Sequence, residues 1–320
     1  MSIVLGSDEG GPAKPIGISA QNLDSLRDDR EVYIGGDRVK DVTKDARFAG
    51  AAETMADLLQ MQHEPSLQDV LTYSSPSSGD RVGMSHIQPG SPEDVKSRGD
   101  AMQLWMDTTC GMLGRSPDYK NVMVAAWAAA AASFKRDTFD GSDNIKNFYE
   151  RVRENDLMMT HVLVNPQVDR SRPAHLQESE IVAQIVRETD EGMIVRGARM
   201  VATLCALANE IVVMPAALTW QTDEQHKTTN YAFGFAIPTN TPGLKFICRP
   251  SVAHLDAASP MDGPLSLRYD ESDGIAVFDD VLVPWERVFL FRDKEAEVVI
   301  RGKTGAGPHA LHQSVVRAVS

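Results

Sequence analysis

The spacing of apolar residues changes twice along this chain, and this change constrains the fold more than any other feature. From about residue 20 to residue 157, apolar residues recur every three to four positions, as they do in amphipathic helices. Short apolar runs separated by Gly, Pro and Asp then follow, which is typical of a β-barrel or sandwich. After Asp293 the helical spacing returns. The sequence therefore predicts an α+β chain whose β region lies between two helical regions.

These changes predict four segments: a flexible Gly- and Pro-rich arm at 1–20, an N-terminal helical domain at 21–157, a middle β-barrel domain at 158–291, and the start of a C-terminal helical domain at 292–320.

Local signals refine this division. Gly35-Gly36 predicts a hairpin between two strands. Ser91 followed by Pro92 and two acids predicts the capped start of a helix that runs to about Met112. Thr72–Asp80 is predicted to be a loop, and turns are predicted at Glu191-Gly192 and Arg196-Gly197.

The order of these regions is that of the acyl-CoA dehydrogenase-like fold, in which a final four-helix bundle follows the β domain. The 320-residue sequence stops inside its last helical segment, so we expect this bundle to be largely missing. Apolar residues of that segment are then expected to face water or a partner chain: Val298, Val299, Ile300, Leu311, Val315 and Val316.

Charge and composition exclude several classes of protein. The formal net charge of -13 and the pI near 5.1 argue against a nucleic acid or an anionic membrane as partner. The three cysteines form no CxxC pair, which favours a reducing compartment, and we expect no metal site. The N-terminus lacks the features of a signal peptide, and the longest apolar run is shorter than the roughly 20 residues that span a bilayer. These features predict a cytoplasmic protein.

Six segments occur in a fixed order along the chain and carry a family resemblance: SLRDDREVYIGGDRVKDVT, GRSPDYKN, THVLVNPQVDR, IVRGARMVATL, PGLKFICRPS and FDDVLVPWERVF. With these segments the chain resembles the 4-hydroxyphenylacetate 3-monooxygenase family, the oxygenase components of two-component flavin-dependent phenol hydroxylases. The resemblance covers the chain from about residue 20 to its end.

The resemblance implies an FADH2-dependent ortho-hydroxylase that acts on a small phenolic substrate. FAD arrives reduced from a separate flavin reductase, reacts with O2, and acts through a flavin C4a-hydroperoxide. The full-length form is expected to be a homo-oligomer, either a dimer or a tetramer.

Three residues are candidates for the catalytic site. A free phenol has a pKa near ~10, so hydroxylation requires groups that stabilise its oxygen as phenolate. Arg115 and Tyr119 flank Pro117, which predicts a helix start, and their four-residue spacing could direct both into one pocket. Composition alone favours a surface arginine and a packing tyrosine at a helix start, and a lone histidine such as His161 on an apolar strand is more often a core residue. The resemblance implies that all three contact the substrate, with His161 also beside the flavin, so we predict that they converge.

Further contacts are implied by the resemblance. Gln167, Val168, Asp169 and Arg170 form a turn that would contact FAD, and Thr203 would be another flavin contact. Each assignment has a structural alternative. The turn can be one that simply ends a strand, and Thr203 can be an ordinary strand residue. Ala216-Ala217 would line the substrate site, where family members that hydroxylate aryl acids carry hydroxyl residues. This departure predicts a less acidic or differently shaped aromatic substrate than 4-hydroxyphenylacetate.

Other functions remain open at this point. A dehydratase of the same fold would need a pair of cluster-ligating cysteines near Arg115 and Tyr119, and the sequence has no such pair there. An acyl-CoA dehydrogenase-like flavoprotein is a second alternative. An inactive, truncated remnant of the hydroxylase family is the third.

Overall fold

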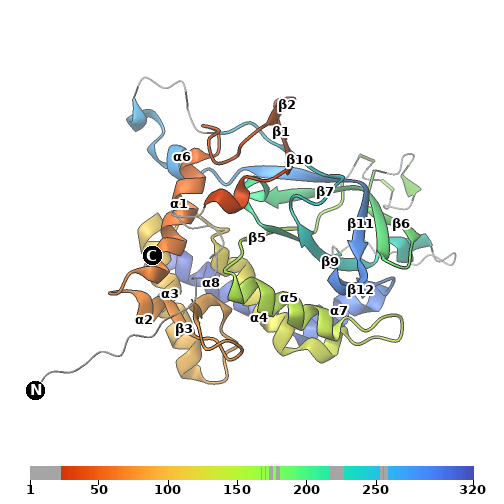
Figure 1. Cartoon of the computed structure of the whole chain (residues 1–320), viewed down its shortest axis with the longest axis horizontal. Helices are drawn as coiled ribbons and strands as arrows, with labels where there is room; N and C mark the ends of the chain where they lie inside the picture. Colours follow the sequence, from red (N-terminus) through yellow and green to blue (C-terminus); the bar gives the residue numbers. More distant parts are fainter. Residues whose placement is uncertain are drawn as a thin grey trace, which may run out of the picture.

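The computed structural model describes residues 23–166, 168–169, 171–172, 176–177, 181–215, 227–252, 255 and 259–320. The helices are α1 (Ala49–Gln60), α2 (Gln68–Leu71), α3 (Pro92–Thr109), α4 (Pro117–Ala129), α5 (Ser142–Glu154), α6 (Pro264–Tyr269), α7 (Lys294–Lys303) and α8 (Ala306–Val319). Figure 1 shows that α3, α4, α5, α7 and α8 gather in one layer, below a layer of strands.

The strands are β1 (Glu31–Ile34), β2 (Asp37–Val39), β3 (Thr72–Ser74), β4 (Arg81–Gly83), β5 (Met159–Val162), β6 (Gln184–Glu188), β7 (Gly192–Thr203), β8 (Glu210–Val213), β9 (Phe233–Pro238), β10 (Leu244–Cys248), β11 (Asp273–Pro284) and β12 (Val288–Phe291). They form a six-stranded sheet of order β2-β1-β10-β11-β7-β6, a four-stranded sheet of order β12-β9-β8-β5, and the hairpin β3-β4. Apolar side chains from both larger sheets share one buried core. The region between residues 195 and 250 contains no α-helix among its described residues, as the short apolar runs predict.

Of the two turns predicted in this region, the one at Glu191-Gly192 is confirmed and the one at Arg196-Gly197 is wrong. β6 and β7 do form a hairpin that turns before Gly192, but β7 continues through Arg196 and Gly197 without a turn. Gly197 instead has a φ of 112°, and a Cβ there would lie 2.6 Å from the backbone of Val182. Glycine is needed here because the backbone takes a left-handed conformation against a neighbouring segment. The predicted loop at Thr72–Asp80 is also corrected, since its first three residues pair with β4.

The predicted boundaries between domains remain predictions, but one segment crosses them. The hairpin of β1 and β2 forms as expected around Gly35-Gly36, and β1 pairs in parallel with β10. A strand from the predicted helical domain therefore extends the sheet of the predicted β domain. Parallel pairing across more than 200 residues leaves no local trace in the sequence.

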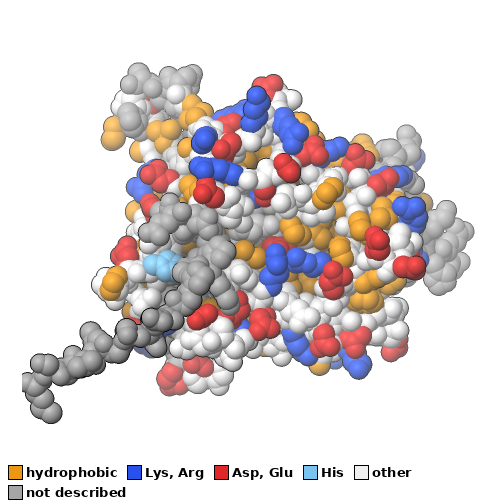
Figure 2. Space-filling view, viewed as in Figure 1, with side chains coloured by type: hydrophobic (Ala, Val, Ile, Leu, Met, Phe, Trp, Pro, Cys, Tyr) orange, Lys and Arg blue, Asp and Glu red, His pale blue; other side chains and the backbone are white. Residues whose placement is uncertain are grey.

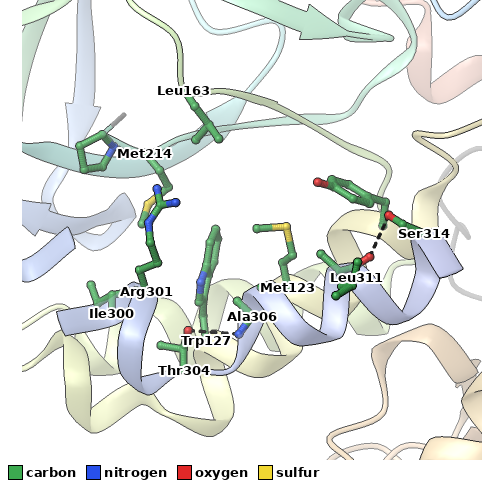
Figure 3. A pocket seen from close by; sticks show the side chains of 14 residues that line it. Met123, Trp127, Leu163, Met214, Ile300, Arg301, Thr304, Ala306, Leu311 and Ser314 are labelled. Atoms are coloured by element: carbon green, nitrogen blue, oxygen red, sulfur yellow. Dashed lines mark hydrogen bonds between the residues drawn. The ribbon is translucent and has the colours of Figure 1, made fainter. Parts of the chain in front are cut away.

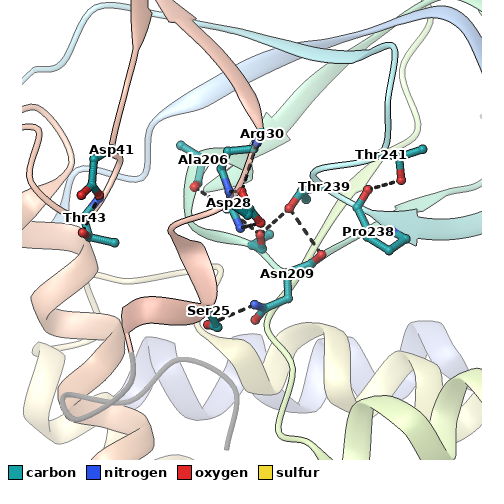
Figure 4. Close-up of polar contacts among 11 residues, drawn as sticks. Ser25, Asp28, Arg30, Asp41, Thr43, Ala206, Asn209, Pro238, Thr239 and Thr241 are labelled. Carbon is teal, nitrogen blue, oxygen red and sulfur yellow. Dashed lines mark hydrogen bonds and ion pairs between the residues drawn. The ribbon is translucent and has the colours of Figure 1, made fainter. Parts of the chain in front are cut away.

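Arg30 anchors this N-terminal segment to the middle sheet (Figure 4). It is 5% exposed and donates hydrogen bonds to the backbone oxygens of Ala206 and Ala208, at 2.8 and 2.9 Å. Its Nε lies 2.7 Å from a carboxylate oxygen of Asp28. The charge of the buried guanidinium is thus matched within the chain by Asp28. This cluster joins the N-terminal segment to the middle sheet.

The expected exposure of the last helical segment is wrong for part of it. Ile300 is only 3% exposed because α7 packs against the segment Ala131–Phe134. Val316 packs against the core because α8 lies against α3 and α4. Val298, Leu311 and Val315 remain exposed, at 65%, 63% and 52%. Buried residues on the inner side of α8 hold it to the helical layer, so this segment supplies part of a cavity wall described below.

The surface in Figure 2 carries acidic and basic side chains interspersed over the same face. Among the described helices, none combines the length and the apolar character needed to cross a bilayer.

Candidate active site

The first turn of α4 is fixed by a buried polar cluster. Pro117 occupies the first helical position, where a missing N–H costs nothing. The Ser116 hydroxyl donates to the Asp118 carboxylate at 2.6 Å, and Gln313 from α8 donates to the Ser116 oxygen at 3.2 Å. Burial raises the pKa of Asp118 to about 6. These contacts set the direction in which the next two side chains, Tyr119 and Lys120, leave the helix.

Arg115, Tyr119 and His161 come together as predicted. The guanidinium carbon of Arg115 lies 4.2 Å from the centre of the Tyr119 ring. The rings of Tyr119 and His161 are 6.1 Å apart between centroids and tilted by 37°. His161 reaches this point from β5, whose residues alternate between the sheet interior and the helical layer. The roles of the three residues in catalysis remain predictions.

Lys120 joins the same cluster and was not predicted from the sequence. It is 4% exposed, and its Nζ lies 4.6 Å from the centre of the Tyr119 ring. Burial lowers the pKa of Lys120 well below its usual value, and the charge of Arg115 lowers it further. Burial likewise lowers the pKa of His161 well below its usual value, with the charges of Lys120 and Arg115 adding to the effect. The imidazole is therefore neutral at physiological pH.

The nearest carboxylate recorded at this cluster belongs to Glu271. It accepts a hydrogen bond from the backbone N–H of Arg115, not from its guanidinium. Burial raises the pKa of Glu271, while the charges of Arg115 and Arg317 act in the opposite direction. The guanidinium of Arg115 donates only to the backbone oxygen of Gly114, at 3.2 Å, within the described part of the chain. The cluster consequently carries more positive than negative charge.

Tyr119 also lines a cavity of about 400 Å³. Figure 3 shows this cavity between α4, which contributes Met123 and Trp127, and the ends of β5 and β8, which contribute Leu163 and Met214. α7 and α8 close it from a third side with Ile300, Arg301, Thr304, Ala306, Leu311 and Ser314. Thioether, indole and aliphatic groups dominate the wall, so the cavity suits an aromatic molecule whose polar end meets the cationic cluster.

The turn after β5 is only partly described. Val168 is 70% exposed, and Asp169 accepts hydrogen bonds from Ser171, which lower the pKa of its carboxyl. Gln167 and Arg170 lie outside the described residues, so their predicted contact with FAD stays a prediction.

The base of that turn is held by Asn165, whose side-chain oxygen accepts a hydrogen bond from the buried Arg199 of β7. Burial lowers the pKa of Arg199 to about 10. The described residues offer no partner to Nε and Nη2 of this guanidinium.

Thr203 is close to β5 but on the side away from His161. Its backbone oxygen accepts a hydrogen bond from the Thr160 hydroxyl at 2.7 Å, and its own hydroxyl donates to Asp273 at 2.6 Å. Neighbouring strand residues point to opposite faces, so Thr160 and His161 face different layers. The structure therefore does not bring Thr203 into the Tyr119 cluster. Ala216 and Ala217 lie outside the described residues, immediately after the cavity-lining Pro215.

Residues 19–290 match the family profile described as 4-hydroxyphenylacetate 3-hydroxylase N terminal. The chain belongs to this family. The oxygenase component of 4-hydroxyphenylacetate 3-monooxygenase from Thermus thermophilus is 44% identical over 285 residues, which are 89% of this chain and 56% of that protein. The chain thus spans a little over half the length of this family member.

Solved structures agree with the family assignment. The oxygenase component HpaB of 4-hydroxyphenylacetate 3-monooxygenase, in complex with FAD and 4-hydroxyphenylacetate, has a TM-score of 0.85 and 42% sequence identity, covering 93% of this chain and 60% of that one. An archaeal 4-hydroxybutyryl-CoA dehydratase from N. maritimus has a TM-score of 0.79 at 18% identity, which shows a shared fold alone. The α+β, acyl-CoA dehydrogenase-like fold predicted from the sequence is confirmed over the N-terminal and middle regions.

Proposed function

We propose that this chain forms the phenol-binding part of the oxygenase component of a two-component, flavin-dependent monooxygenase. The reaction is the insertion of one oxygen atom of O2 next to a phenolic hydroxyl, with reduced FAD delivered by a separate reductase. The observation that carries the proposal is the meeting of Arg115 and His161 at the ring of Tyr119, which lines a largely apolar cavity. The family membership supports the reaction type.

The three residues would act on the phenolic oxygen. Arg115 is a permanent cation and a hydrogen-bond donor, so it stabilises a phenolate relative to a phenol. The neutral His161 has one nitrogen that accepts a hydrogen bond and one that donates, which lets it receive the phenolic proton or hold the oxygen. The Tyr119 hydroxyl can donate to the same oxygen. An ionised phenol is more electron-rich at its ortho carbon, which is the position to be hydroxylated.

The residues present fit a flavin at this site. Val168 exposes a large apolar side chain that a planar ring can cover, and the buried Arg199 has two nitrogen groups without a partner among the described residues. His161, Val168, Asp169 and Thr203 are the described residues that the family resemblance assigns to FAD. When bound, reduced FAD supplies the electrons that activate O2. The Met, Trp and Leu side chains of the cavity exclude water from that chemistry.

The substrate is proposed to be a phenol without an acidic side chain. The resemblance places Ala216-Ala217 where aryl-acid hydroxylases carry hydroxyl groups. The described wall near these residues, Met214 and Pro215, is apolar as well.

The test is the formation of a catechol with oxygen from O2. The chain, a flavin reductase, NADH, FAD and ¹⁸O2 are incubated with a panel of para-substituted phenols, and products are analysed by mass spectrometry. We expect one ¹⁸O atom per catechol, and higher turnover for phenols with uncharged substituents than for 4-hydroxyphenylacetate. Reductase with FAD but without the chain is the control. Absence of labelled catechol for every phenol would contradict the proposal.

A further inference from the structure

Lys120 is a buried lysine whose amine forms no ion pair with the described residues. Its Nζ contacts the sulfur of Met123 at 3.4 Å and the ring of Tyr119 at 4.6 Å. Both of these residues line the cavity, so the amine lies beside the part of the wall that Tyr119 and Met123 form. Arg115 and His161 contact the same Tyr119 ring.

The local sequence offers Lys120 no acid. The residues three and four positions away on the helix are Pro117, Ser116, Met123 and Val124, none of which is charged. No ion pair of Lys120 is found in the described part of the chain, and the charge that acts on its amine, that of Arg115, has the same sign. Glu271, the recorded carboxylate of the cluster, is held on the backbone of Arg115.

Such an arrangement is costly in a folded protein. A buried ionised group without a partner loses its hydration and gains nothing in return, so buried charges are normally paired. Substituting an apolar side chain would remove that cost. A lysine at the wall of an aromatic-lined cavity is therefore explained most simply by an anionic ligand that enters the cavity and supplies the missing charge.

We propose that Lys120 is a specificity-determining residue that holds the phenolic ligand as its phenolate, so that the site selects phenols by their ease of ionisation. This inference rests on the proposed function. If the amine is neutral before binding, it takes the phenolic proton and leaves an ammonium–phenolate pair. If it is already an ammonium, it pairs with a phenolate whose proton has gone to solvent. Both routes conserve atoms and charge, and both end in the same bound state.

A second consequence concerns Arg115. The charge of Arg115 repels a protonated Lys120 on the same tyrosine ring, and this repulsion adds to burial in lowering the Lys120 pKa. An anion beside both groups offsets the repulsion. Ligand binding should then relieve this repulsion, and the gain should be largest for the ligand that ionises most readily. Affinity is therefore expected to rise steadily as the pKa of the free phenol falls.

The experiment measures affinity across a series of para-substituted phenols of similar size, from 4-methylphenol to 4-cyanophenol and 4-nitrophenol. Dissociation constants are obtained by equilibrium dialysis with FAD kept reduced under anaerobic conditions, at one pH. For the unaltered chain, the logarithm of the dissociation constant should fall with the pKa of the phenol. Lys120→Met should flatten this slope and weaken binding of 4-nitrophenol about ten- to hundredfold, as expected for loss of a buried charged hydrogen bond.

Two further variants separate specificity from folding. Lys40→Met removes the same charge from an exposed position and should leave the slope unchanged. Lys120→Arg keeps the charge and should restore most of the slope. Lys120→Met should unfold at the same temperature or higher, because it removes a buried charge without a counter-ion. The absorbance of bound 4-nitrophenol gives a second readout: the phenolate spectrum is expected with Lys120 and a shift toward the phenol spectrum without it.

Each failure has a distinct meaning. An unchanged slope and an unchanged nitrophenol spectrum in Lys120→Met would overturn the role of Lys120 and leave the proposed function standing. Failure of every phenol to bind the unaltered chain would overturn the proposed function and this inference with it.

Discussion

Two clusters of cationic side chains in this molecule, one around the buried Arg30 and one around the partly buried Arg115 and the buried Lys120, differ in how their charges are matched. Arg30 has a carboxylate and two backbone oxygens around its guanidinium, and it joins the N-terminal segment to the middle sheet. Arg115 and Lys120 meet at one tyrosine ring, and the described residues give neither side chain a carboxylate partner. A buried charge that is satisfied within the chain stabilises the fold, whereas one that is not satisfied indicates a place for a ligand.

The largest effect on stability is expected at Arg30. Arg30→Met leaves two buried carbonyl oxygens and Asp28 without their partner, which should lower the free energy of unfolding by about 3–5 kcal/mol. Urea denaturation followed by circular dichroism measures this change. Arg38→Met, at an exposed position of the adjacent strand, is the matched control and should change it little. Equal stability of the two variants would remove the distinction between the clusters.

Arg115→Met should show the opposite pattern. Loss of the cation that stabilises the negative charge on the phenolic oxygen should reduce kcat/KM for phenol hydroxylation by about 10²–10³-fold. Stability should change by less than about 1 kcal/mol, because the guanidinium gives up one backbone hydrogen bond and a contact with the Tyr119 ring. Steady-state kinetics and urea denaturation on the same preparation test both parts. A large loss of stability would place Arg115 with Arg30, as a structural residue.

The junction between α8 and the first turn of α4 should respond to pH through Asp118. Its folded pKa of about 6 is raised above that of an unfolded aspartate, so the folded state holds the proton more tightly. The stability that protonated Asp118 contributes is fully present below pH ~4, the pKa of an aspartate in the unfolded chain. It is lost as the pH rises through about 6, the pKa of Asp118 in the folded chain. Asp118→Asn stays neutral, so its stability relative to the unaltered chain should rise between pH 4 and pH 7, by up to about 3 kcal/mol at about 1.4 kcal/mol per pKa unit. A difference that does not depend on pH would show that burial does not perturb this carboxyl.

The smallest effect is expected for a paired charge at the surface. Arg196 forms two hydrogen bonds with Asp280, at 2.7 and 2.6 Å, but both side chains are about half exposed. Arg196→Met should therefore change the free energy of unfolding by only about 0–1 kcal/mol. A larger loss in urea denaturation would mean that pairing alone, without burial, separates structural cations from functional ones.

Local sequence signals predicted those parts of this structure whose causes are local. Ser91 caps α3 as predicted, where Asp94 completes a capping box, and Pro117 begins α4 where expected. The spacing of Arg115 and Tyr119 indicated their meeting, although the family resemblance was needed to distinguish a site from a surface pair.

The features that sequence reasoning missed depend on contacts between distant segments. Lys120 is a single lysine in a helix, a pattern typical of a solvated face, and its burial arises from the packing of α4 against β5 and α8. An acid missing at three- and four-residue spacing was the one available signal. The contact of Gln313 with Ser116 likewise joins residues almost 200 positions apart.

The central claim is that the cations at the start of α4 hold a phenolic oxygen in its ionised form. The most direct measurement is ¹³C NMR of a phenol labelled at the carbon that carries the oxygen, bound to the chain with reduced FAD at a pH where the free phenol is protonated. We predict the chemical shift of a phenolate for the unaltered chain and a shift toward that of the phenol for Arg115→Met. A phenol signal in the unaltered chain, or the same signal in both, would contradict the account.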